Sequence, residues 1–149
     1  MQRIYNSGFE IEPRIILIAD TYPLSSFTED LFVAIDFITV YSGAFISGAQ
    51  NLHGDNGFKF SEITARRQSV HEAVKKLVLE GFLIVEIRDG FSYRISDTGK
   101  QYAKSFESTY ATQYKNNLLF VSEKYLDYDE KALSKLITEK ALADSREEM

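Results

Sequence analysis

The stretch FKFSEITARRQSVHEAVKKLVLEGFLIVEIRDGFSYRISDTG, residues 58–99, decides the fold of this chain. Its first three residues alternate as a short strand does. From Thr64 to Glu80, Val70, Val74, Leu77 and Val78 recur at helical spacing, and a glycine follows where a helix would end. The pattern predicts a helix with one buried stripe.

The second half of the same stretch is typical of a β-hairpin. Residues 83–87 and 91–95 alternate apolar with polar side chains on either side of Asp89-Gly90, a dipeptide that favours a two-residue turn. A short polar segment, Ser96-Asp97-Thr98-Gly99, follows the hairpin and forms a corner before the next helix. Helix, hairpin and corner in this order are typical of a winged helix-turn-helix, so we expect a mainly α-helical protein with a small β-hairpin.

Helices are expected on both sides of this stretch. Pro13 lies in the first turn of a helix that ends before Tyr22-Pro23, and a second helix covers about Thr28 to Tyr41. The glycine-rich segment Ser42–Gly57 reads as a loop or a short helical turn followed by a loop. We therefore divide the chain into a winged-helix domain, 1–114, and a C-terminal extension of amphipathic helices, 115–149.

Composition and charge limit the function classes. The chain has 149 residues, no cysteine and a net charge of −5. Disulfides and thiolate chemistry are therefore excluded, and a broad DNA-gripping surface is disfavoured. No basic leader with an apolar run is evident, so we expect a cytoplasmic protein with no membrane contact.

Charge is unevenly distributed along the chain. Residues 59–104 hold nine basic and six acidic side chains, whereas residues 1–58 hold two and seven. This asymmetry favours a local contact with double-stranded DNA or with an acidic protein partner, or else it is a solvated face. The candidate DNA-binding residues are Arg66, Arg67, Lys75, Lys76, Arg88 and Arg94.

The segment after Gly99 carries aromatic residues at every fourth position. We expect one long helix with an aromatic stripe, followed by a leucine-rich amphipathic segment, and both have more apolar area than a small domain readily hides. The candidate partner-binding residues are Tyr102, Phe106, Tyr110, Tyr114, Leu133, Leu136 and Ile137. The alternative is that the stripe packs back on the first two helices.

Catalytic motifs are missing from the sequence. His53 and His71 have no metal-ligand spacing, and no phosphate loop or nucleophile elbow is present. The carboxylates at 127–130 are typical of a helix start rather than of a cation site. We expect no enzyme activity, no metal and no cofactor.

Four short motifs resemble a known family. Arg66-Arg67, Glu80-Gly81-Phe82-Leu83, Gly90-Phe91-x-Tyr93 and Thr98-Gly99 resemble the small winged-helix middle component of ABC-three-component systems. Such subunits accompany SMC-like ABC ATPases in bacterial anti-phage and anti-plasmid defence modules of the Lamassu type. The resemblance covers roughly Ile4 to Tyr114.

The resemblance implies an adaptor subunit. Its partners would be an SMC-like ABC ATPase subunit and an effector subunit, commonly a nuclease, with DNA contact inside the assembly left open. The alternative is a stand-alone winged-helix transcriptional regulator that places the helix of residues 64–80 in a major groove. The two hypotheses differ in genomic neighbourhood, since only the adaptor requires an adjacent gene for a large coiled-coil ATPase.

Overall fold

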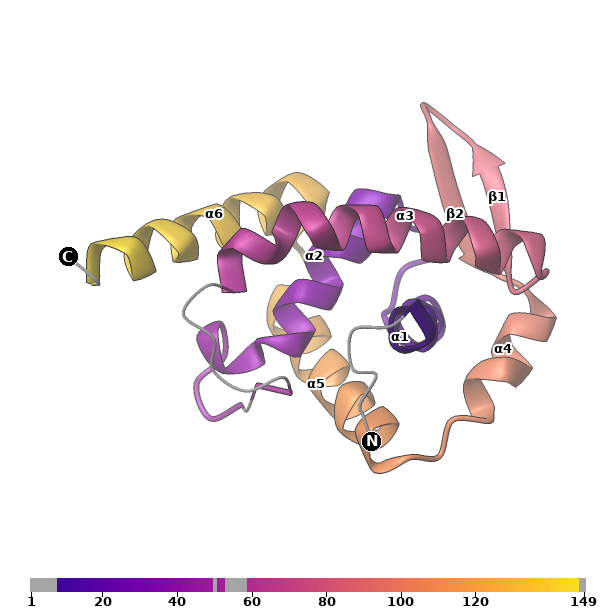
Figure 1. The fold of residues 1–149 in the computed structure, drawn as a ribbon, viewed down its shortest axis with the longest axis horizontal. Helices are drawn as coiled ribbons and strands as arrows, with labels where there is room; N and C mark the ends of the chain where they lie inside the picture. Colours follow the sequence, from indigo (N-terminus) through magenta and orange to yellow (C-terminus); the bar gives the residue numbers. More distant parts are fainter. Residues whose placement is uncertain (1–7, 50, 53–58, 148–149) are drawn as a thin grey trace.

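The computed structural model describes residues 8–49, 51–52 and 59–147, except for the side chains of 8–10, 59 and 144–147. The described part is mainly helical, with a single two-stranded antiparallel sheet (Figure 1). Its α-helices are α1 (Gly8–Thr21), α2 (Glu29–Val40), α3 (Ile63–Leu79), α4 (Asp97–Lys104), α5 (Thr109–Tyr125) and α6 (Glu130–Glu147). No helix in these residues is long and apolar enough to cross a membrane.

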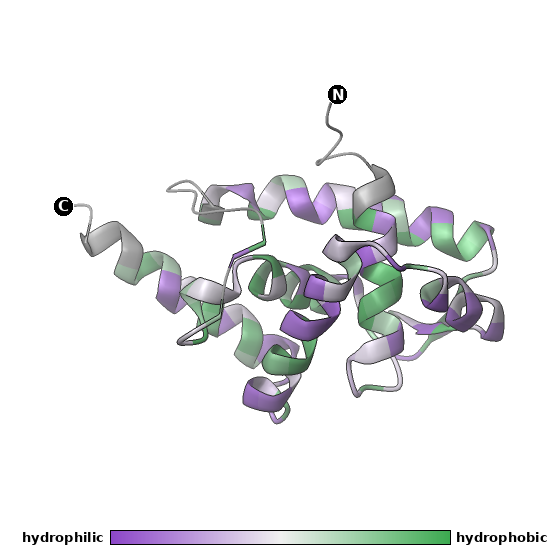
Figure 2. Ribbon diagram, turned by 90° about the horizontal axis from the view of Figure 1, so that it is seen from below, coloured by the Kyte–Doolittle hydropathy of each residue, from purple (hydrophilic) through white to green (hydrophobic). Residues whose placement is uncertain are grey.

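Helix α2 is the centre of the molecule. Every residue from Leu31 to Val40 is buried, and α1, α3, α5 and α6 all pack against α2. The Thr28 hydroxyl caps the helix by accepting a hydrogen bond from Leu31 N at 3.1 Å. The predicted span of this helix is confirmed, and Figure 2 shows hydrophobic residues gathered where the helices meet.

Helix α1 begins earlier than the sequence predicts. It starts at Gly8, so Pro13 lies inside the helix and not in its first turn. A proline inside a helix removes one backbone hydrogen bond. Ile11, Ile15 and Ile18 are buried in the core on either side of it, and this apolar contact outweighs the lost bond.

The predicted α3 and hairpin are confirmed. Helix α3 ends at Leu79, and Gly81 follows with a φ of 84°, in the left-handed region that favours glycine. Strands β1 (Leu83–Ile87) and β2 (Phe91–Ile95) then pair in antiparallel register. Phe27, between α1 and α2, adds an isolated bridge to β2, with reciprocal backbone bonds to Tyr93 of 2.8 Å.

The expected strand at 58–60 is wrong. Phe58 lies outside the described residues, and Lys59–Glu62 forms a 3-10 helix, η2. The ring centroids of Phe60 and Phe37 of α2 are 5.4 Å apart, so this segment is held by contact with the core and not by strand pairing. The loop prediction for 42–57 is confirmed where it is described, because a single turn, η1 (Ser42–Ala44), precedes irregular chain.

The long helix expected after Gly99 is two helices. Helix α4 ends at Lys104, and α5 starts afresh after Ser108, whose hydroxyl accepts from Ala111 N at 3.1 Å. This serine cap competes with helix continuation and turns the chain. The expected domain boundary after Tyr114 lies inside α5.

Helix α4 sits close to the hairpin base. An added Cβ on Gly99 would lie 2.2 Å from the Phe82 carbonyl oxygen and 2.7 Å from Ile95 Cγ1. Only glycine therefore fits where α4 meets the start of β1.

Candidate functional site

Arg66 does not lie on a basic surface. Its side chain is buried, and its guanidinium pairs with the carboxylate of Asp36 on α2. Glu62, one turn earlier, lies 3.6 Å away. The sequence predicts that Arg66 lies beside Arg67 on the exposed side of the helix. Because Arg66 instead pairs with the buried carboxylate of Asp36, it is not one of the surface cations predicted to bind DNA.

Asp36 holds four helices together. Arg14 of α1 donates to its two carboxylate oxygens at 2.8 and 3.0 Å, and the Tyr114 hydroxyl of α5 donates at 2.5 Å. With Arg66 of α3, these groups surround a carboxylate that has no exposed surface. We call Arg14, Asp36, Arg66 and Tyr114 the Asp36 cluster.

Charge pairing inside the cluster outweighs the cost of burial. Burial opposes ionisation of Asp36, but Arg14, Arg66 and the Tyr114 hydroxyl hold the pKa of Asp36 well below its ordinary value. Burial also opposes the charge on Arg14, yet Asp36 holds the Arg14 pKa above its ordinary value. Burial, reinforced by Asp36, raises the pKa of Tyr114. Asp36 and Arg14 are thus charged in the core, the Tyr114 hydroxyl keeps its proton, and the cluster has a structural role.

Three of the other predicted cations are exposed but face carboxylates. Arg67 Nε lies 4.0 Å from Asp30 Oδ1, Lys76 Nζ lies 3.4 Å from Glu12 Oε2, and Arg94 Nε lies 3.2 Å from Glu86 Oε2. His71, on the same helix as Arg67 and Lys76, lies 2.8 Å from Glu29. Much of the positive charge predicted for this side of the molecule is therefore balanced by nearby acids.

Lys75 and Arg88 are the two predicted cations that form no ion pair with the described residues. Lys75 is exposed on α3, and Arg88 is exposed beside the hairpin turn. Two cations provide far less counterion release than a six-residue basic face.

The predicted partner-binding residues lie in or against the core. Tyr114 and Leu133 are fully buried, and the rest are partly buried against the same core. Tyr102 stacks on Phe82 at 4.3 Å and meets Phe106 edge-on at 4.7 Å. Because the serine-capped break divides the stripe between α4 and α5, its rings pack back on their own domain. The remaining members are Tyr110, Leu136 and Ile137.

The hairpin exposes apolar side chains that sequence reasoning missed. Ile87 is 78% exposed, Phe91, its cross-strand neighbour, is 62% exposed, and Val85 next to them is 42% exposed. All three share a sheet face with Leu83, which is buried. The alternation of apolar and polar residues was visible in the sequence. It does not show at which residue the hairpin stops packing on the helices. We call Val85, Ile87 and Phe91 the hairpin tip.

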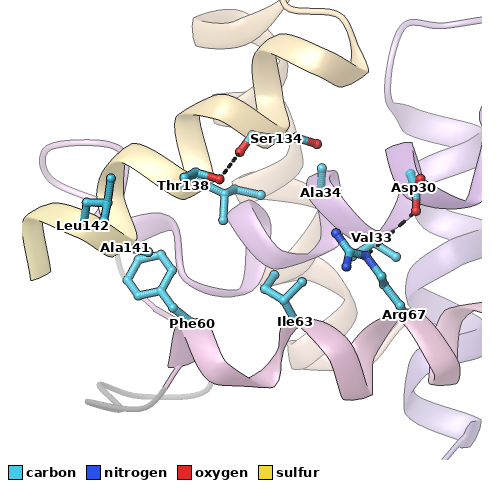
Figure 3. Close-up of a pocket in the computed structure, with 11 residues that line it drawn as sticks. Asp30, Val33, Ala34, Phe60, Ile63, Arg67, Ser134, Thr138, Ala141 and Leu142 are labelled. Atoms are coloured by element: carbon cyan, nitrogen blue, oxygen red, sulfur yellow. Dashed lines mark hydrogen bonds and ion pairs between the residues drawn. The ribbon is translucent and has the colours of Figure 1, made fainter. Parts of the chain in front are cut away.

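A groove lies at the other end of the molecule. It has a volume of about 280 Å³ and runs between α6 and the start of α3 (Figure 3). Phe60 and Ile63 line one wall, and Ala141 and Leu142 of α6 line the other. Leu142 is 53% exposed. In Figure 1 the hairpin and the projecting half of α6 lie at opposite ends of the molecule.

The comparison with protein-family models identifies the family. Residues 4–147 match the model of the ABC-three component (ABC-3C) system Middle Component 2. The chain belongs to this family. No curated protein and no solved structure matches the chain. As a middle component, it is a part of a multi-subunit system.

Acidic and histidine side chains do not gather into a metal centre anywhere in the described part of this middle component. The carboxylates at 127–130 include Asp129, whose Oδ1 accepts from Ala132 N at 2.8 Å and caps α6. His53 lies outside the described residues.

Proposed function

We propose that this middle component is a non-catalytic adaptor that links an SMC-like ABC ATPase subunit to an effector, as in Lamassu-type bacterial defence against phage and plasmids. One observation carries the proposal: the hairpin tip and the α6 groove lie at opposite ends of the molecule. An adaptor needs two such surfaces, since each partner must be held while the other is bound.

The hairpin tip is the stronger of the two surfaces. Apolar burial is worth about 25 cal/mol per Å². Ile87 and Phe91 are large side chains that the chain's own core leaves mostly in water. A partner that covers them gains this energy without disturbing the middle component. We assign the tip to the ATPase subunit and the groove to the effector.

Element order supports a winged-helix ancestry. Three helices precede the hairpin, and the segment between the first two bridges to β2 at Tyr93. This is the order of a winged helix whose first strand is reduced to one bridge. The long connection between α2 and α3 departs from a compact helix-turn-helix.

This ancestry keeps the stand-alone DNA-binding regulator as the second candidate. In a winged helix, α3 would enter the major groove and the hairpin would touch the backbone. The carboxylates beside Arg67, Lys76 and Arg94 weaken this candidate, because an acid that already neutralises a cation repels phosphate. Among the six predicted DNA-binding residues, Lys75 and Arg88 are the two that remain available for a DNA contact.

Co-expression of the tagged chain with the products of the neighbouring genes tests the proposal. Ile87→Lys combined with Phe91→Lys should release the ATPase subunit, and Leu142→Lys should release the effector. Leu119→Lys is the matched control, because Leu119 is 51% exposed and lies on α5, outside both surfaces. Retention of both partners by every variant, or equal loss in the control, contradicts the adaptor.

The regulator makes a different prediction in the same samples. It predicts DNA binding by the chain alone, with a salt dependence that flattens in a Lys75→Ala, Arg88→Ala variant. The adaptor predicts that these substitutions leave both partners bound. The chain alone should hydrolyse neither ATP nor DNA, and activity abolished by a substitution within it would refute the non-catalytic role.

A further inference from the structure

Strand β1 has a free outer edge. Arg88 N donates to Gly90 O at 2.8 Å, and Ser96 N donates to Phe82 O at 3.1 Å. In an antiparallel pair, hydrogen-bonded and non-hydrogen-bonded positions alternate. The backbone groups of Ile84 and Glu86 therefore point to β2, and those of Leu83, Val85 and Ile87 point away from it.

The other strand confirms this alternation. Tyr93 is opposite Val85, and its N–H and carbonyl point outward, because they bond to Phe27 at 2.8 Å in both directions. Phe27 thus occupies part of the outer edge of β2. On the outer edge of β1, the described residues provide no backbone partner for Val85 or Ile87.

The β1 edge lacks the features that normally prevent strand pairing. Charged side chains, prolines and bulges protect exposed edges in natural sheets. Within β1 the sequence is Leu-Ile-Val-Glu-Ile, paired to β2 without a bulge, and its one charge, Glu86, is held by Arg94 across the hairpin at 3.2 Å. Added strands would also stabilise the projecting end of the hairpin, which has only two strands.

We propose that β1 pairs antiparallel with β1 of a second copy of this chain, about a two-fold axis at Val85. The strand is self-complementary in this register. Val85 faces Val85 of the second copy, Leu83 faces Ile87, and Ile84 faces Glu86, so apolar side chains meet on one face and no like charges are opposed.

Neighbouring registers are worse. An axis at Glu86 also uses the free edge groups, but it brings two carboxylates directly opposite each other. An axis at Ile84 pairs only residues 83–85 of each strand. The Val85 register alone pairs all five residues of β1 and keeps the two Glu86 side chains apart.

The proposed pair is a four-stranded sheet of two hairpins. Because the two β1 strands are antiparallel, the two hairpin turns lie at opposite ends of this sheet. The apolar side chains of both copies lie on the same face of the sheet, and this face remains available to another subunit. The inference does not depend on the proposed function, because it concerns the chain by itself.

The absence of cysteine gives a direct test. Hydrogen-bonded antiparallel residues have Cα atoms about 5.5 Å apart, within the range of a disulfide. A Val85→Cys chain should form a covalent dimer under mild oxidation, at a rate at least tenfold above that of a Leu119→Cys control. Equal rates for the two single-cysteine chains overturn the proposal.

A second variant tests the backbone edge. Val85→Pro removes an N–H that the hairpin itself does not use, so the hairpin should persist by circular dichroism while the mass by sedimentation falls from dimer to monomer. A wild-type chain that is monomeric at tens of micromolar overturns the proposal, as does a dimer that survives Val85→Pro. Cross-linking of Val85→Cys only to a partner subunit would assign the edge to that subunit instead. Retention of partners by Val85→Pro reports on the adaptor role separately.

Discussion

The Asp36 cluster and the hairpin tip are opposite exceptions to the rule that charged side chains lie at the surface and large apolar side chains lie in the core. At the centre, two arginines and one aspartate are buried, each held by a charged or hydroxyl partner. At the tip, a phenylalanine and an isoleucine lie in water. Buried charge that is paired within the chain belongs to the fold, whereas a cluster of exposed apolar side chains is typical of contacts with other chains.

Removing the Asp36 carboxylate should have the largest effect. Asp36→Ala leaves two buried guanidinium groups and the Tyr114 hydroxyl without their acceptor, so we expect a loss of about 3–5 kcal/mol in the free energy of unfolding, measured in urea. Asp30→Ala is the matched control, because Asp30 is exposed and 4.0 Å from Arg67, and it should cost at most about 1 kcal/mol. Equal effects of the two substitutions would show that the cluster does not hold the helices.

Acid should weaken the same cluster. A carboxylate whose pKa is lower in the folded state contributes stability that is present above its unfolded pKa of about 3.9 and is lost as pH falls toward its folded pKa. We therefore expect the free energy of unfolding to fall as pH drops below about 4, with this one carboxylate as a main contributor. Unfolding curves of Asp36→Asn should lack this component, and an unchanged acid dependence in that variant would contradict the assignment.

Gly99→Ala tests the close contact between α4 and the base of the hairpin. The new Cβ meets the Phe82 carbonyl oxygen at 2.2 Å, and this backbone atom cannot move alone, so we expect a loss of about 1–3 kcal/mol. Thr98→Ala, at the exposed neighbouring position, should change stability by less than about 0.5 kcal/mol. Thermal or urea unfolding that ranks the two variants equally would refute this close contact.

The smallest effect on stability is expected at the tip. Ile87→Ala should change the free energy of unfolding by less than about 0.5 kcal/mol, because its side chain is already in water. Leu83→Ala, on the same strand and sheet face but buried, should cost about 2–5 kcal/mol. A large loss from Ile87→Ala in urea would mean that the tip packs on the body.

The sequence predicts elements whose signals are local. Helix α2 and the hairpin are confirmed almost to the residue, because capping, alternation and the Asp-Gly turn act over a few positions. The break between α4 and α5 has a local signal as well, in Ser108, but the four-residue aromatic spacing conceals it.

Long-range placement was harder to predict. The burial of Arg66 depends on its contact with Asp36, 30 residues away in the sequence, and the burial of the Tyr114 hydroxyl depends on the same carboxylate, 78 residues away. One signal was available: Asp36 is the single charge within Leu31–Val40, and a carboxylate in a buried helix requires cations from other elements. The exposure of Ile87 and Phe91 depends on how far the hairpin extends beyond α3 and α4, which alternation does not encode.

The central claim is that the hairpin tip contacts the ATPase subunit, and photo-cross-linking tests it most directly. A benzophenone side chain would replace Phe91 in the complex assembled with the neighbouring gene products, and Leu119 in a parallel sample. The account predicts that the probe at position 91 cross-links to the ATPase subunit and that the probe at position 119 does not. Cross-links from position 91 only within the same chain or to a second copy, with the complex intact, would contradict it.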